Sequence, residues 1–138
     1  MLKKIALSAV ASLAVTAPSL ADDSAMSQAF AQARLAAFGS GDIDAMVAQY
    51  TDDATVFTPQ GVLHGKEQIR AMLQAVVAEF SQPGVVFNLT SMETAGPNVA
   101  FVWNAETNQN SYSLGVETYV LAEGKAVYQT LVLSAVAK

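Results

Sequence analysis

The sequence predicts an α+β domain in which three N-terminal helices pack on one face of a strongly curved, mostly antiparallel sheet. Two observations support this fold class. In the first half of the chain, apolar residues recur every three or four positions, most regularly over residues 69–80. The second half contains four long runs of strand-forming residues separated by short turn segments. Strands joined by such turns pair as antiparallel hairpins, and helices followed by hairpins are typical of the α+β class.

The first 21 residues are predicted to be a signal peptide. Lys3 and Lys4 give a positive start, residues 5–15 are apolar apart from serines, and small residues stand at positions 19 and 21. This apolar run is shorter than the roughly 20 residues that a membrane span needs. We therefore expect cleavage near Ala21, a periplasmic or secreted protein, one domain over residues 22–138, and no stable membrane association after cleavage.

The helices are predicted from their capping residues. Ser24 is a good N-cap for a first helix, and Gly39 is predicted to end it, because glycine takes the left-handed conformation at little cost. Asp42 is predicted to cap a short second helix, where its carboxylate accepts from free backbone amides. A third helix is predicted after Gly65, over residues 66–80, and the Pro83-Gly84 pair ends it.

The strands are predicted from β-branched and aromatic runs between turn residues. A first strand is expected over residues 54–58, followed by a turn at 59–61 and a short return over 62–64. The four strands of the second half are expected over residues 85–94, 99–107, 112–122 and 126–135.

Composition excludes several classes of function. The chain has seven basic and twelve acidic residues, and two of the basic ones lie in the predicted leader, so the mature domain is strongly acidic. Such a surface repels nucleic acid and anionic lipid. The chain has no cysteine and one histidine, too few ligands for a zinc site, so we expect no metal and no disulfide. No glycine-rich phosphate loop or nucleophile elbow is present, and no cofactor is expected.

The segments between residues 41 and 70 carry a family resemblance. Residues 41–44 read Gly-Asp-Ile-Asp, residues 50–56 read Tyr-Thr-Asp-Asp-Ala-Thr-Val, and a Thr58-Pro59 pair is followed by Gly61 and by Gly-Lys-Glu-Gln-Ile-Arg at 65–70. In this order the chain resembles the nuclear transport factor two-like superfamily, which includes ketosteroid isomerase, scytalone dehydratase and the SnoaL-type polyketide cyclases. The resemblance implies a cone-shaped α+β barrel, with the sheet wrapped around the long helix to leave a conical pocket, and a homodimer.

Carried over residue by residue, the resemblance argues against ketosteroid isomerisation. The position of the isomerase's general base is similar to Thr58, which does not accept a proton at neutral pH. The position of its oxyanion-hole tyrosine matches Arg34, and that of its protonated aspartate matches Glu117. Two of the three positions therefore differ in chemistry, although Glu117 keeps a carboxyl group.

Arg34 and Glu117 are the strongest candidates for a functional site, because each is a lone charge among apolar neighbours. In a pocket they would form a buried ion pair, with Arg34 holding an anionic group and Glu117 acting as acid or base. The alternative is that one or both face solvent. His64 is a second candidate for proton transfer, with a surface histidine as the alternative. The other residues expected to line the pocket are Phe57, Thr58, Met72, Phe80, Trp103 and Tyr119.

Three functions remain open from the sequence. The first is an exported domain that binds a small organic ligand, neutral or anionic, in an apolar cone. The second is a lyase, isomerase or cyclase that uses Glu117 or His64 for proton transfer. The third is a dimeric interaction module with a filled cone. A cavity lined by Arg34 and Glu117 favours the first two, and a cone plugged by Trp103 and Phe80 favours the third.

Overall fold

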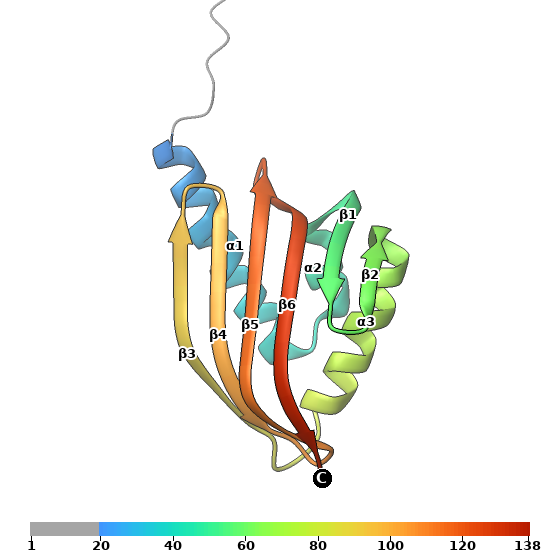
Figure 1. The fold of residues 1–138 in the computed structure, drawn as a ribbon. Coiled ribbons are helices and arrows are strands. Elements are labelled where there is room, and N and C mark those ends of the chain that lie inside the picture. The colour runs from blue at the N-terminus through green and yellow to red at the C-terminus, as the bar shows by residue number, and fades with distance from the viewer. Residues whose placement is uncertain (1–19) are drawn as a thin grey trace, which may run out of the picture.

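The computed structural model describes residues 20–138 (Figure 1). Nearly all of the predicted signal peptide, residues 1–21, therefore lies outside the described residues. Between residues 20 and 138, no helix combines the length and apolar character needed to cross a bilayer.

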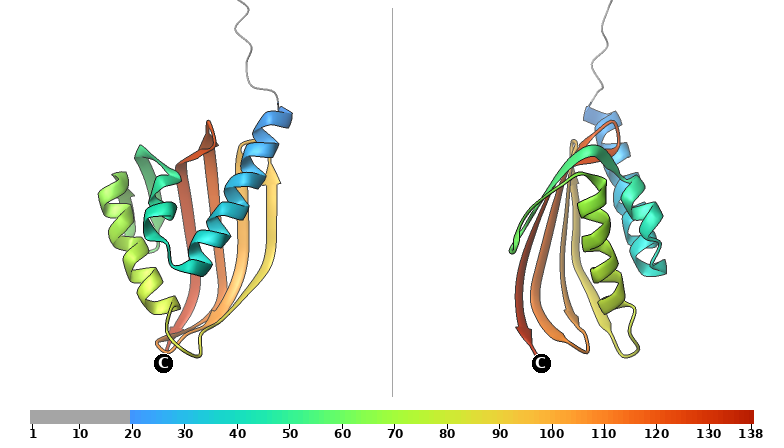
Figure 2. Two further views of the ribbon diagram at one scale, coloured as in Figure 1. Left: turned by 180° about the vertical axis from the view of Figure 1, so that it is seen from behind. Right: turned by 90° about the vertical axis from the view of Figure 1, so that its right-hand side faces the viewer.

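Three helices cover one face of a six-stranded sheet, which confirms the predicted α+β class (Figures 1 and 2). The sheet order is β2-β1-β6-β5-β4-β3, and every neighbouring pair is antiparallel except β1 and β6. The sheet is strongly bent toward the helices but does not close, so β2 and β3 remain edges (Figure 2). The elements are α1 Leu20–Ser40, α2 Ile43–Ala48, β1 Tyr50–Thr58, β2 Gly61–His64, α3 Gly65–Phe80, β3 Val86–Ala95, β4 Asn98–Glu106, β5 Asn110–Ala122 and β6 Lys125–Ala137.

The junction between α1 and α2 corrects one prediction and confirms another. Helix α1 continues through Gly39, and the left-handed residue is Gly41, with a φ of 68°. The amide of Gly41 donates to the carbonyl of Phe38 and that of Asp42 to the carbonyl of Ala37, the pairing of a Schellman motif. Asp42 caps α2 as predicted, because its Oδ1 accepts from the amide of Ala45 at 2.9 Å.

The core lies between the helices and the inner face of the sheet. Along β4 the residues that face the helices are buried, whereas their neighbours in sequence are more exposed, the alternation expected of a half-covered sheet. Ile69 and Leu73 are the buried residues of α3, which confirms that the predicted helical rhythm marks its core face. The outer face of the sheet stays uncovered and carries exposed apolar side chains, among them Val120, Tyr128 and Val132.

Candidate functional site

A cavity of about 190 Å³ lies between the inner face of the sheet and helices α1 and α3. Its polar wall residues are Arg34, Glu79, Tyr112 and Glu117. The rest of the wall is mostly aliphatic and aromatic: Leu35, Phe38, Ala75, Val76, Phe80, Phe87, Leu89, Phe101, Trp103, Leu131 and Leu133. Phe80 and Trp103, which plug the cone in the third sequence-based alternative, line the cavity instead.

Arg34 projects from α1 and is 7% exposed. Its Nη2 donates to the hydroxyl of Tyr50 at 2.9 Å, and its Nη1 donates to the carbonyl of Met46 at 3.3 Å. The guanidinium carbon lies 5.3 Å from the ring centre of Tyr50 and 5.5 Å from that of Tyr119, within cation–π range. Burial acts to lower the pKa of Arg34, but the neighbouring tyrosine oxygens and the Glu117 carboxylate outweigh it and raise the pKa. The side chain is therefore a permanent positive charge at the cavity wall.

Glu117 on β5 faces the same cavity and is held by two donors. Its Oε2 accepts from the hydroxyl of Tyr119 at 2.5 Å and from Nε2 of Gln129 at 3.3 Å. Oε1 of Gln129 accepts from the hydroxyl of Tyr50 at 2.5 Å, and Tyr50 in turn accepts from Arg34. One hydrogen-bonded network thus joins all five side chains, which come from α1, β1, β5 and β6.

The direct ion pair expected between Arg34 and Glu117 is not formed. Among residues 20–138, no nitrogen of Arg34 lies within ion-pair distance of the Glu117 carboxylate. Tyr50 and Gln129 stand between them and relay the interaction. Burial raises the pKa of Tyr50 and of Tyr119, so both phenols keep their protons and act as donors within this network.

An aromatic cluster forms another part of the cavity wall. The ring of Trp103 lies 5.9 Å from that of Phe80, 5.5 Å from that of Phe87 and 5.6 Å from that of Tyr112, between ring centres. The indole packs flat on Gly115, where an added Cβ would lie 2.2 Å from its Cε2 atom. The indole nitrogen is buried and has no hydrogen-bond partner among the described residues.

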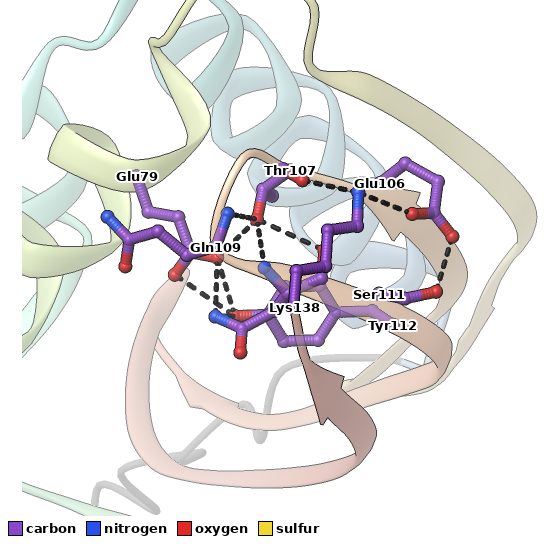
Figure 3. Close-up of polar contacts among 8 residues, drawn as sticks. Glu79, Glu106, Thr107, Gln109, Ser111, Tyr112 and Lys138 are labelled. Atoms are coloured by element: carbon purple, nitrogen blue, oxygen red, sulfur yellow. Dashed lines mark hydrogen bonds and ion pairs between the residues drawn. The ribbon is translucent and has the colours of Figure 1, made fainter.

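A polar cluster at the carboxyl end of α3 ties that helix to the turn between β4 and β5 (Figure 3). Oε1 of Glu79 accepts from Thr107 Oγ1 at 2.6 Å, from Asn110 Nδ2 at 2.8 Å and from the Tyr112 hydroxyl at 3.0 Å. Beside it, Lys138 donates to the carbonyl of Thr107 at 2.6 Å. The cluster holds the turn against α3 next to the cavity, because Glu79 and Tyr112 belong to both.

Sequence reasoning did not single out Glu79, although a signal was present. A carboxylate in the last turn of a helix opposes the helix dipole, so its presence there indicates partners elsewhere in the fold. Burial alone would raise the pKa of Glu79, but hydrogen bonds from Thr107, Asn110 and Tyr112 outweigh it and lower the pKa. Burial and the neighbouring Glu79 raise the pKa of Tyr112 to about 12.

The hydrogen bonds to Glu79 should make the free energy of unfolding depend on pH in the acidic range. Because its folded pKa is below the ordinary 4.5, ionised Glu79 stabilises the fold above that pH, and this contribution disappears as the pH falls through the folded pKa. We expect Glu79→Gln to cost about 1 kcal/mol at neutral pH, since the group is partly solvated. The cost should vanish in acid, as measured by urea unfolding across the pH range. Glu67→Gln, an exposed change on the same helix, is the control, and a cost for Glu79→Gln that does not change with pH would contradict the expectation.

Five of the predicted site residues lie outside the cavity wall. Val56 is fully buried, so strand alternation turns its neighbour Phe57 to the outer face, where it is 44% exposed. Thr58 closes the turn after β1, with its Oγ1 donating to the carbonyl of Gly61 at 2.9 Å. His64 is exposed on β2, and its Nδ1 lies 3.3 Å from Oγ1 of Thr55.

The fourth residue, Met72, is half-buried against the core of α3 rather than at the cavity, because the face of the helix that meets the cavity carries Val76, Glu79 and Phe80. Tyr119 does not line the cavity either and acts through its hydroxyl on Glu117. Within residues 20–138, no group of three histidine, cysteine, aspartate or glutamate side chains is placed to hold a metal ion.

Comparisons with known proteins place this geometry in a wider group. The model of a family described as the SnoaL-like domain matches residues 31–129. A nuclear transport factor two-like protein of unknown function from Mesorhizobium loti has a similar structure, with a TM-score of 0.70 and 18% identity, covering 82% of this chain and 94% of its own. No curated protein matches the chain in sequence.

Two further similar structures carry functional descriptions. A putative ketosteroid isomerase from Kribbella flavida has a TM-score of 0.67 and 17% identity, covering 84% of this chain and 83% of its own. A putative hydroxylase from Streptomyces galilaeus has a TM-score of 0.65 and 14% identity, covering 80% of this chain and 90% of its own. At such low identity these likenesses establish the fold alone.

Proposed function

Because the chain belongs to the SnoaL-like family of the nuclear transport factor two-like superfamily, we propose that it binds a small, mostly apolar organic molecule in the cavity, with Glu117 as the polar anchor. The observation that carries this proposal is that only one of the two Glu117 carboxylate oxygens is hydrogen-bonded within the described part of the chain. Its Oε2 accepts from Tyr119 and Gln129, whereas its Oε1 accepts from no group among residues 20–138. A carboxylate has about four acceptor positions, so Glu117 retains room for a ligand's hydrogen-bond donor.

The cavity wall supports the same proposal. Ligand sites combine apolar walls with a few fixed polar groups, and here the polar groups are held by the network around Arg34 and the cluster around Glu79. Because both sets are already hydrogen-bonded, they do not have to reorganise when a ligand enters.

Trp103 is the single tryptophan of the sequence and lines the cavity, so its fluorescence reports occupancy. We expect phenol to change that fluorescence in a saturable manner. Glu117→Gln should weaken the binding about tenfold, since it removes the charge from a hydrogen-bond acceptor. Glu67→Gln, an exposed carboxylate elsewhere, should bind phenol as the parent does. A fluorescence that phenol leaves unchanged, or equal affinity of the Glu117→Gln variant, would contradict the proposal.

A lyase, isomerase or cyclase activity is the second candidate, and Glu117 favours it. Its carboxylate is a possible general base at an apolar wall, and Tyr119 is a donor within 2.5 Å of it. The resemblance to the putative ketosteroid isomerase supports this candidate at the level of fold. Thr58 and His64 do not support it, because both lie away from the cavity.

We also propose that the protein forms a homodimer through the outer face of the sheet. Val120 pairs across the strands with Tyr128, and Val116 pairs with Val132. Val120, Tyr128 and Val132 are 42%, 50% and 52% exposed, and contiguous exposed apolar side chains are typical of interaction surfaces. Residues 1–21 are in turn proposed to direct export, so that the dimer would act in the periplasm or outside the cell.

The dimer can be tested by one charge on this face. We expect Val132→Glu to halve the mass found by sedimentation equilibrium, because it would place two carboxylates in a symmetric apolar interface. Glu93→Gln on β3 is a control away from the centre of the face and should leave the mass unchanged. A parent protein that sediments as a monomer would exclude the dimer.

A further inference from the structure

The size of the cavity limits what it can hold. Its volume is about 190 Å³. An engineered apolar cavity of about 150 Å³ holds one benzene molecule, and sites for drug-sized ligands occupy roughly 300–1,000 Å³. The cavity therefore accommodates one or two rings, and a four-ring skeleton would extend beyond it.

Trp103 is a tightly packed part of the cavity wall. Its indole packs on the backbone of Gly115, at a distance that leaves no space for even a methyl group between them. Phe80, Phe87 and Tyr112 surround the indole at ring-centre distances of 5.5 to 5.9 Å. The backbone on one side and these three rings leave the indole little room to move away from a ligand.

The charges at the wall select against anions. Two carboxylates, Glu79 and Glu117, line the cavity together with one guanidinium. The guanidinium already donates to Tyr50 and to the carbonyl of Met46, and it lies against two tyrosine rings. A ligand anion would thus be repelled by two carboxylates, and the apolar wall around Glu117 screens that repulsion less than water does. This charge balance differs from the sequence-based expectation that Arg34 would anchor an acidic ligand.

Resting on the proposed ligand binding, we infer that the cavity takes uncharged compounds of one or two rings that carry a hydroxyl or N–H donor. The donor would bond to the Glu117 oxygen that lacks a partner, and the rings would lie against Trp103 and Phe80. Glu117 would then set the preference for a neutral donor over an anion, and Trp103 would set the upper size. Both are specificity-determining residues in this assignment.

The inference can be tested by calorimetry on the protein at neutral pH with three ligands. 2-Naphthol is neutral and carries a donor, 2-naphthoate has the same rings and a negative charge, and estradiol presents a phenol on four rings. We expect 2-naphthol to bind at least tenfold more tightly than either of the others. Trp103→Phe should reduce the ratio of the affinities for 2-naphthol and estradiol at least threefold, because phenylalanine is smaller than tryptophan and leaves more room along this wall. Tyr128→Phe, on the outer face of the sheet, is the matched control and should leave this affinity ratio unchanged.

The outcomes separate this inference from the proposed function. If 2-naphthoate binds as tightly as 2-naphthol, the charge selection is overturned while ligand binding stands. If estradiol binds as tightly, or if Trp103→Phe leaves the size preference unchanged, the size limit is overturned. If none of the three ligands binds and phenol leaves the Trp103 fluorescence unchanged, the proposed function fails, and the inference fails with it.

Discussion

Replacing Arg34 with methionine should lower the free energy of unfolding by about 3 kcal/mol. Methionine keeps much of the length and apolar volume of the side chain but removes the charge and the donors to Tyr50 and Met46. The Tyr50 hydroxyl then loses a partner inside the core, and the Glu117 carboxylate loses the positive charge closest to it in the network. Unfolding in urea, followed by circular dichroism, measures the loss.

A matched control is available on the surface. Arg70 pairs with Asp44 at 2.6 Å, and both side chains are substantially exposed, so Arg70→Met should cost about 0.5 kcal/mol or less. Coupling to Glu117 can be measured with a double-mutant cycle. We expect Arg34→Met combined with Glu117→Gln to cost at least about 1 kcal/mol less than the sum of the two single changes, since they share a network. Additive costs would show that Arg34 does not stabilise the Glu117 carboxylate.

The second large effect is expected at Gly115, where alanine should cost about 1–3 kcal/mol because it overpacks the aromatic wall. The added Cβ would lie 2.2 to 2.5 Å from three atoms of the Trp103 indole, a fused ring that cannot bend away. The indole must therefore shift, and its near-ultraviolet circular dichroism should change together with the midpoint of thermal unfolding.

Gly39 provides the control for this substitution. It lies within helix α1, and a Cβ there would meet no atom within 4 Å. Alanine favours a helix over glycine by about 1 kcal/mol, so Gly39→Ala should leave stability unchanged or raise it. A Gly115→Ala variant as stable as the parent, with an unchanged indole signal, would contradict the close packing of Trp103 on that strand.

The order of elements was predictable because local signals agree with the global fold. Asp42 caps α2, the 69–80 rhythm marks the core face of α3, and each long β-branched run became a strand. The errors are mostly shifts of a few residues. The first strand begins at Tyr50 rather than Ala54, and the left-handed turn falls at Gly41 rather than Gly39. Local propensity does not fix where pairing with a distant strand begins, and β1 pairs with β6, the last strand of the chain.

The sequence predicts the two charged residues of the site but not the hydrogen-bonded residues that join them. Arg34 and Glu117 stood out because each is a lone charge in an apolar element, and both line the cavity. They are joined by Tyr50 and Gln129, which lie 79 residues apart in the chain. No local sequence pattern pairs two positions so far apart. The sequence predicts Phe57 at the pocket, yet its neighbour Val56 faces the core and Phe57 therefore faces outward. A shift of the strand register by one residue would exchange which of the two side chains faces the core.

The most direct test of the account is the place at which a small aromatic ligand binds. Nuclear Overhauser effects between the ring protons of 2-naphthol and the protein locate it without any substitution. We expect contacts to Phe80, Trp103 and Leu131, whose side chains line the cavity. Contacts confined to Val120, Tyr128 and Val132 would instead place the ligand on the outer face of the sheet and contradict the central claim that the protein holds its ligand inside.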